Sequence, residues 1–176
     1  RGGDLGPVAE RYFRAAAGLD VSPDGGPAEF YTNLQAEREA DAFLARHGLG
    51  RQRRIMAIAP GAAHFTKRWP PEYWSALIRR LRSTRDIVVL GGPAERALGE
   101  QLAKEGGEAA ASAAGLFSLV GSGALLKRAA TLISGDTGLL HLATAVGTPV
   151  LGLYGPGIRE FGFFPYRAPS RVLEQQ

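Results

Sequence analysis

The feature that most constrains the fold is a set of short apolar runs that show no alternation with polar residues. A strand without such alternation is buried on both faces, as in parallel sheets that are covered by helices. Segments with helical spacing separate the runs, and regular succession of strand and helix is typical of α/β folds. We therefore predict a Rossmann-like, doubly wound parallel sheet. Its clearest strands are Ile55–Ala59, Asp86–Leu90, Thr131–Ser134 and Val150–Tyr154.

The segments between these runs carry the predicted helices. After Pro70 and Pro71, apolar residues recur at the i, i+3, i+4, i+7 spacing of an amphipathic helix. The helix that starts near Gln35 is expected to end at Gly48, since glycine favours the left-handed backbone that follows many helices. A short strand is expected at Leu116–Val120. Further helices are predicted at Val8–Leu19, after Pro93, at Gly123–Ala130 and at Leu139–Val146.

The character of the sequence changes near residue 50. Asp20–Pro27 is rich in glycine, proline and aspartate and is expected to be a loop. The strand and helix pattern described above becomes regular only after it. We therefore expect residues 1–50 to form a linker with leading helices, and residues 51–176 to form a single Rossmann-like domain.

Composition excludes several classes of protein. The chain has no cysteine, which rules out a disulfide framework and thiolate metal sites. No apolar run is long enough to cross a bilayer, and the first residues lack the apolar stretch of a signal peptide, so a cytoplasmic location is expected. The net charge is +4 and arginine supplies most of the positive charge. Arginine suits phosphate-bearing partners, but a solvated basic face is an equal alternative. The aromatic and basic pattern of nucleic-acid-binding proteins is absent.

In a doubly wound fold, ligands bind in the loops that follow the carboxyl ends of the strands. The first such loop, Pro60–Trp74, places Lys67 and Arg68 shortly before a predicted helix. Two cations near the positive end of a helix favour a bound anion, and a diphosphate fits this arrangement. The alternative is an exposed basic loop without a ligand.

The second loop, Leu90–Arg96, begins with Gly91 and Gly92, which allow a ligand to approach the backbone closely. Glu95 lies in the first turn of the next helix. Its carboxylate either accepts hydrogen bonds from ribose hydroxyls or stabilises the positive end of the helix dipole. The residues alone do not separate these roles.

The third loop, Ser134–Pro156, carries the strongest signal. Asp136 ends a strand, and Thr137 and Gly138 offer backbone N–H groups at the start of the next helix. His141 follows three residues after Gly138 and therefore shares its face. A lone histidine on an apolar helix is commonly a core residue, but the neighbouring Asp-Thr-Gly turn favours a ligand-binding role.

Signatures of other nucleotide-dependent and hydrolytic enzymes are missing. The sequence contains no P-loop, and Gly121-Ser122-Gly123 lacks the third glycine of the dinucleotide fingerprint. It contains neither a G-x-S-x-G elbow nor a zincin pair. A P-loop ATPase, a dehydrogenase and a serine hydrolase are therefore disfavoured.

The strings PGA…TKRWP, VVLGGPAER and ISGDTGLLHLATAVGTPVLGLYGP resemble the signature blocks of the ADP-heptose:lipopolysaccharide heptosyltransferases, glycosyltransferase family 9. The resemblance implies the C-terminal half of a GT-B fold, which binds an ADP-sugar donor without a metal or other cofactor. By matching motif, it implies that Lys67 holds the diphosphate, Glu95 the ribose and Asp136 the sugar hydroxyls. The remaining donor-binding residues implied by these blocks are Arg68, Thr137, Gly138, Leu139 and His141.

The resemblance also implies what the rest of the protein does. The family transfers heptose, with inversion, to the lipid-A core, and its N-terminal domain binds this acceptor and supplies the catalytic base. That domain is not in this sequence, so the isolated chain is expected to bind donor without transferring sugar. A peripheral contact with the inner membrane is also implied, and nucleic acid is not. The stretch between Leu119-Val120-Gly121 and Leu125-Leu126 is shorter than in the family, which leaves base specificity open. The alternatives are a non-catalytic nucleotide-binding module and a GT-B-like sugar-nucleotide epimerase.

Overall fold

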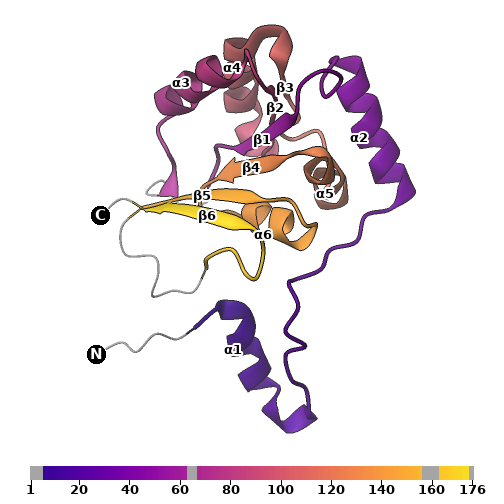
Figure 1. Ribbon diagram of the computed structural model, residues 1–176, viewed down its shortest axis with the longest axis vertical. Coiled ribbons are helices and arrows are strands. Elements are labelled where there is room, and N and C mark those ends of the chain that lie inside the picture. The colour runs from indigo at the N-terminus through magenta and orange to yellow at the C-terminus, as the bar shows by residue number, and fades with distance from the viewer. Residues whose placement is uncertain (1–5, 63–66, 156–162, 175–176) are drawn as a thin grey trace.

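Six parallel strands form one sheet in the order β3-β2-β1-β4-β5-β6 (Figure 1). The computed structural model describes residues 6–62, 67–155 and 163–174. From β1 the chain moves first toward one edge of the sheet and then toward the other, which is the doubly wound arrangement. The predicted α/β fold is confirmed. The strands are β1 (Ile55–Ala59), β2 (Asp86–Val89), β3 (Ala110–Ser112), β4 (Thr131–Ser134), β5 (Val150–Tyr154) and β6 (Ser170–Glu174).

Helices cover both faces of the sheet. On one face, α3 (Pro71–Leu81) packs beside α4 (Arg96–Gly106). On the other face, α5 (Leu119–Arg128) lies between α2 (Leu34–Arg46) and α6 (Gly138–Ala145). The remaining helical segments are α1 (Val8–Ala15) and the 3-10 turns η1 (Ala17–Leu19), η3 (Pro93–Glu95) and η4 (Gly107–Ala109).

Successive residues of each central strand enter different hydrophobic cores. In β1, Ala57 packs in the core beneath α2 and α5, whereas Ile58 packs against α3 and α4 with Trp74. All four residues of β2 are buried. Because both faces of the sheet are covered, these strands carry apolar residues on both faces, and the buried polar residues Asp86 and Ser134 stand at strand ends. This burial is why they lack the alternation of a half-exposed strand.

One predicted strand was placed wrongly. Leu116–Val120 is not a strand: Ser118 caps α5, accepting a hydrogen bond from the Gly121 N–H at 3.1 Å, and the helix begins at Leu119. The third strand is instead β3, which pairs with β2. Its sequence, Ala-Ala-Ser, has no β-branched or aromatic residue, and alanine favours helices. Pairing with β2 overrides that local preference. The edge strand β6 was not predicted.

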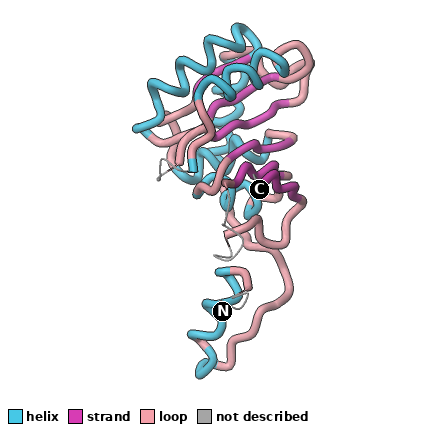
Figure 2. Tube along the Cα trace, turned by 90° about the vertical axis from the view of Figure 1, so that its left-hand side faces the viewer, coloured by secondary structure: helices cyan, strands magenta, loops and turns pink. Residues whose placement is uncertain are grey.

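The first fifty residues divide into two parts with different environments. α2 buries Ala40 and Phe43 in the same core as α5, so it packs with the domain although it precedes the expected boundary at residue 50. α1 buries no residue and lies apart from the sheet, at the end of an extended segment (Figures 1 and 2). Glu10 of α1 accepts hydrogen bonds from Tyr166 and Arg167. The boundary itself stays a prediction.

Candidate functional site

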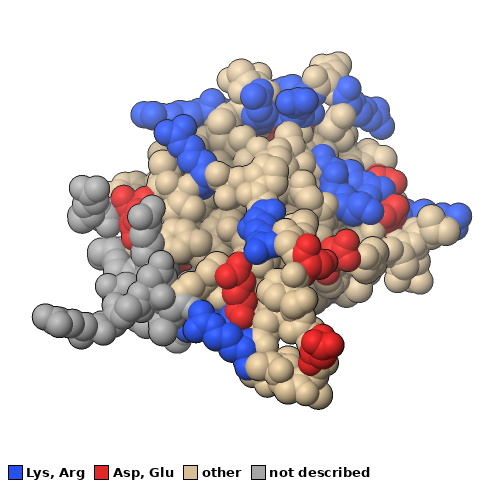
Figure 3. Space-filling view, turned by 60° about the horizontal axis from the view of Figure 1, so that its bottom comes forward, with Lys and Arg blue, Asp and Glu red and all other residues tan. Residues whose placement is uncertain are grey.

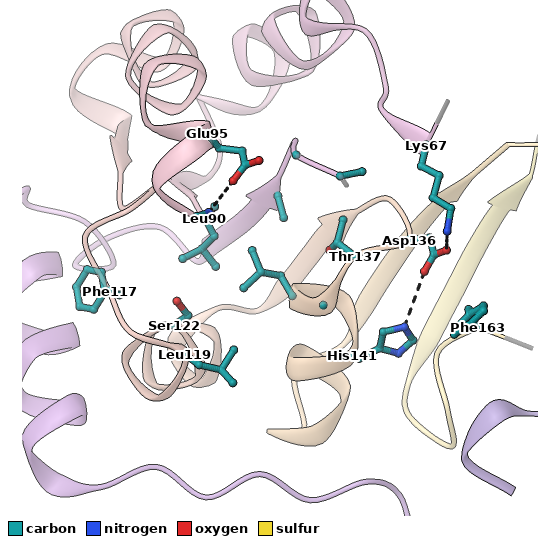
Figure 4. Close-up of a pocket in the computed structure, with 17 residues that line it drawn as sticks. Lys67, Leu90, Glu95, Phe117, Leu119, Ser122, Asp136, Thr137, His141 and Phe163 are labelled. Atoms are coloured by element: carbon teal, nitrogen blue, oxygen red, sulfur yellow. Dashed lines mark hydrogen bonds and ion pairs between the residues drawn. The ribbon is translucent and has the colours of Figure 1, made fainter. Parts of the chain in front are cut away.

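A pocket of 580 Å³ opens at the carboxyl edge of the sheet, between the loops that follow β1, β2 and β4 (Figure 4). It brings together seven of the eight residues that the sequence pointed to. Lys67, Asp136 and His141 lie at one end, and an apolar wall lies at the other. The lining residues are Ala59, Gly61, Ala62, Lys67, Leu90, Gly91, Gly92, Glu95, Phe117, Leu119, Ser122, Asp136, Thr137, Gly138, Leu139, His141 and Phe163.

Asp136 is the centre of the charged end. Its carboxylate accepts a hydrogen bond from Lys67 Nζ at 2.5 Å, and His141 Nε2 lies 3.9 Å from its other oxygen. At 3.9 Å the histidine is at ion-pair distance rather than bonded, so Lys67 is the direct partner. The approach of His141 and of Lys67 lowers the pKa of the Asp136 carboxyl against the opposing effect of burial. The Asp136 side chain is only 8% exposed.

This lowered pKa predicts a pH dependence of stability. A carboxyl whose pKa is lower in the folded state stabilises the fold above its unfolded value of 3.8, and loses that contribution as pH falls through the lower folded value. The melting temperature of the protein should therefore exceed that of an Asp136→Asn variant by a constant amount near neutral pH. The difference should shrink in acid, below 3.8. Thermal denaturation of both proteins across this range measures it, and a difference that grows in acid would contradict the assignment.

Thr137, and not Asp136, caps α6. The Thr137 hydroxyl accepts a hydrogen bond from the Leu140 N–H at 3.3 Å and lies 2.9 Å from the hydroxyl of the fully buried Ser134. Asp136 therefore does not cap this helix. A Cβ built at Gly138 meets no atom within 4 Å, so the first turn of α6 borders open space. The N–H groups of its first residues have no acceptor within the helix, and a helix start of this kind can receive an anion.

Glu95 lies against the glycines of two loops. Its carboxylate accepts a hydrogen bond from the Gly92 N–H at 2.8 Å, which is the helix-start role that the sequence left open. A Cβ at Gly61 would stand 2.5 Å from Glu95 Cγ, and one at Gly91 would stand 2.8 Å from Glu95 Cβ. The side chain therefore fits at the pocket wall only because these two positions lack side chains. Among the described residues its other oxygen has no hydrogen-bond donor, and Glu95 lines the pocket.

The apolar end of the pocket was missed by sequence reasoning. Leu90 follows β2, and Phe117 and Leu119 flank the cap of α5, with Ser122 one turn further along. Phe117 packs edge-on against Phe43 of α2, with ring centroids 5.4 Å apart. The cap signal at Ser118 could have revealed this helix start, but the apolar residues around it suggested a strand instead. These side chains give this end of the pocket an apolar surface.

Arg68 does not line this pocket. Its Nε donates a hydrogen bond to the Ala62 carbonyl oxygen at 2.7 Å, and its side chain borders a neighbouring groove with Trp69 and Tyr73. Lys67 borders that groove as well, so Arg68 lies beside Lys67 there and not in the pocket, and its role in donor binding stays a prediction. Residues 63–66 of the same loop, and Pro156 of the third loop, lie outside the described residues.

Phe163 completes the charged end of the pocket, and no sequence pattern pointed to it. Lys67 Nζ lies 5.9 Å from the centroid of the Phe163 ring. The Tyr154 hydroxyl donates a hydrogen bond to the Phe163 carbonyl oxygen at 3.1 Å. Burial, together with the charge of Asp136, raises the pKa of Tyr154 well above its usual range, so this phenol stays protonated and keeps its donor.

Within the part of the chain that the structure describes, no group of three or more His, Cys, Asp or Glu side chains is placed to hold a metal ion.

Comparison with known proteins gives one consistent answer. The family model of glycosyltransferase family 9 (heptosyltransferase) matches residues 6–171. Lipopolysaccharide heptosyltransferase 1 of Pseudomonas aeruginosa is 38% identical over 164 residues, which is 85% of this chain and 45% of that protein. Lipooligosaccharide heptosyltransferase 2 of Haemophilus influenzae is 28% identical over 165 residues, 87% of this chain and 48% of that protein.

Solved structures agree with the family match. The glycosyl transferase family 9 protein from Veillonella parvula superposes with a TM-score of 0.87 at 26% identity, covering 97% of this chain and 49% of that one. The E. coli heptosyltransferase WaaC with ADP superposes with a TM-score of 0.67 at 25% identity, covering 92% and 48%. The chain spans about half the length of the relatives it matches.

Proposed function

Because this chain belongs to glycosyltransferase family 9, we propose that it binds the sugar-nucleotide donor of a heptosyltransferase. The parent protein would transfer heptose, or a related sugar, from an ADP-sugar to the lipopolysaccharide core with inversion at the anomeric carbon. The observation that carries the proposal is the meeting of Lys67, Asp136 and the start of α6 in one pocket. The relatives named above are heptosyltransferases, which favours this function over an epimerase or a non-catalytic module.

The charged end of the pocket would receive the diphosphate. Lys67 supplies a full positive charge, and the first turn of α6 supplies backbone donors at Gly138 and Leu139. Negative charge develops on the departing ADP as the bond to the sugar breaks. Donors that already stand in place for that charge lower the barrier without having to reorganise. His141 borders the same space and would complete this set.

The other groups would orient the nucleoside and the sugar. Asp136 cannot attract a diphosphate directly, since both are anionic, but its carboxylate can accept hydrogen bonds from sugar hydroxyls. Glu95 would accept from the ribose with the oxygen that faces the pocket. The wall formed by Phe117 and Leu119 would hold the base, which needs a flat apolar surface. In this scheme, the base that activates the acceptor comes from a domain outside this chain.

We also propose a cytoplasmic location with peripheral contact to the inner membrane, where the lipid-A-core acceptor would be met. No helix among the described residues has an apolar stretch long enough to span a bilayer. A nucleotide-sugar donor is the partner expected in the pocket, and nucleic acid is not expected to bind.

Calorimetric titration tests the proposal. ADP should bind with the same affinity in EDTA and in magnesium, because Lys67 and the start of α6 already provide the positive charge that a metal would bring. An ADP-sugar should bind more tightly than ADP under both conditions. A strict magnesium requirement would overturn the metal-independent scheme, and absence of ADP binding in both buffers would overturn the donor-binding function itself.

A further inference from the structure

A second hollow, of 650 Å³, lies at the opposite edge of the sheet. It is bordered by the loop that leads into β1 and by the residues just before β4 and β5. Since the strands are four or five residues long, about 15 Å of sheet separates this hollow from the donor pocket. The lining residues are Gly50, Arg51, Gln52, Arg53, Arg54, Ile55, Arg128, Ala129, Ala130 and Pro149.

Four arginines and no acidic residue line this hollow, which we call the arginine hollow. Arg53 is paired with Asp86 at 2.8 Å and Arg128 with Asp41 at 2.9 Å, so their charges are already balanced. Arg51 and Arg54 are exposed, and among the described residues neither has a hydrogen-bond acceptor or an ion-pair partner. Two uncompensated guanidinium groups therefore remain at one site.

The loop that carries these two arginines is held in a fixed shape. Asp86, which is 2% exposed, accepts hydrogen bonds from the Gly50 N–H at 2.7 Å and from Arg53 Nε at 2.8 Å. Gly50 has a φ of +79°, and a Cβ there would stand 2.9 Å from Ile55 Cδ1. A buried carboxylate thus holds both ends of the loop, and the left-handed backbone at Gly50 disfavours other residues there. This anchoring reduces the ordering cost of binding a ligand.

Of the arginines that line the hollow, only Arg128 is stabilised by a helix dipole. Arg128 lies in the last turn of α5, where a cation is stabilised by the carbonyl end of the helix. Arg51 and Arg54 lie in a loop and gain nothing from a place within a helix. In Figure 3, Lys and Arg side chains crowd the upper part of the face shown, and most of its Asp and Glu side chains lie lower, so charge is distributed unevenly over the surface.

We propose that the arginine hollow is a second anion site, which binds a phosphate-bearing group through Arg51 and Arg54. Guanidinium groups pair bidentately with phosphate oxygens, and two of them at one hollow suit an oligophosphate or the headgroup of an anionic phospholipid. The site is independent of the donor pocket, because it shares no residue with it and faces the other edge of the sheet.

The test compares two double variants that remove the same charge. Arg51→Gln/Arg54→Gln removes the free guanidinium groups, while Arg38→Gln/Lys104→Gln removes two exposed cations elsewhere. Both are made in a Lys67→Ala background so that phosphate contacts in the donor pocket do not contribute. Tripolyphosphate binding is measured by calorimetry. Binding to phosphatidylcholine vesicles with and without phosphatidylglycerol is measured by co-sedimentation, and melting temperatures check that each variant is folded.

The Arg51→Gln/Arg54→Gln variant should bind tripolyphosphate at least about tenfold more weakly than the parent, which is the protein with Lys67→Ala alone. A loss of this size is expected when a charge-assisted contact is removed. The control variant should bind it as the parent does. Loss of tripolyphosphate binding would identify a free oligophosphate as the source, and loss confined to anionic vesicles would identify a lipid headgroup. Equal losses in both variants, or no binding of either probe by the parent, would overturn the proposal.

Discussion

Replacing Lys67 with alanine should lower the affinity for ADP about ten- to a hundredfold. A charge-assisted hydrogen bond contributes about 1.5–3 kcal/mol, and each ~1.4 kcal/mol is a factor of ten. Lys67 must partly leave Asp136 to reach a phosphate, which places the expected loss toward the lower half of that range. Calorimetric titration of the parent and the variant with ADP measures the change.

Arg68 provides the matched control. It is the next residue and carries the same charge, but it donates to the Ala62 carbonyl and does not line the pocket. Arg68→Ala should therefore leave ADP affinity within a few-fold of the parent. If both substitutions weaken ADP binding equally, the effect of Lys67 comes from general charge and not from contact with the diphosphate.

Asp136 and Thr137 are adjacent but should respond to substitution in opposite ways. Asp136→Asn should not weaken ADP binding, and should strengthen it slightly because Lys67 is released from its carboxylate partner. The advantage of an ADP-sugar over ADP should fall by about ten- to a hundredfold, since a hydrogen bond to a charged acceptor is weakened. Thr137→Ala removes the cap of α6. It should lower stability by about 0.5–2 kcal/mol and keep the preference for the sugar.

Melting temperature and both affinities, measured on the two variants, separate the roles. Asp136→Asn removes an ion pair whose Lys67 side chain is 30% exposed, so solvent screens part of the loss and the melting temperature near neutral pH should fall only modestly. An Asp136→Asn protein that melts early yet discriminates between ADP-sugar and ADP as well as the parent does would refute the proposed contact with the sugar.

The parts of the fold that the sequence predicted are those in which local and tertiary preferences agree. β1, β2, β4 and β5 are apolar and buried, and α3 shows a helical spacing that matches its buried face. β3 was misplaced because its alanines favour a helix, and only pairing with β2 makes them a strand. No pattern within such a segment reveals a partner that lies more than twenty residues away.

The residues of the candidate site also divide into those that local sequence predicts and those whose place depends on tertiary packing. Lys67, Asp136 and His141 were identified because each occupies a loop or helix start whose position follows from the strand order. Phe117 and Ser122 were missed, since their place in the pocket depends on where α5 begins and how it packs against α2. Arg68 was included because of its charge, and the sequence cannot show that its side chain turns toward Ala62.

The close fit around Glu95 has an evolutionary consequence. Gly61 and Gly91 come from different loops, yet each leaves room for the same side chain. A single mutation to alanine at either glycine would displace Glu95, because the added Cβ would stand within 2.8 Å of the Glu95 side chain. A lineage that first exchanged Glu95 for a smaller residue would release both glycines, which could then drift freely. These three positions should therefore covary among homologues, and the order of change should run from the glutamate to the glycines.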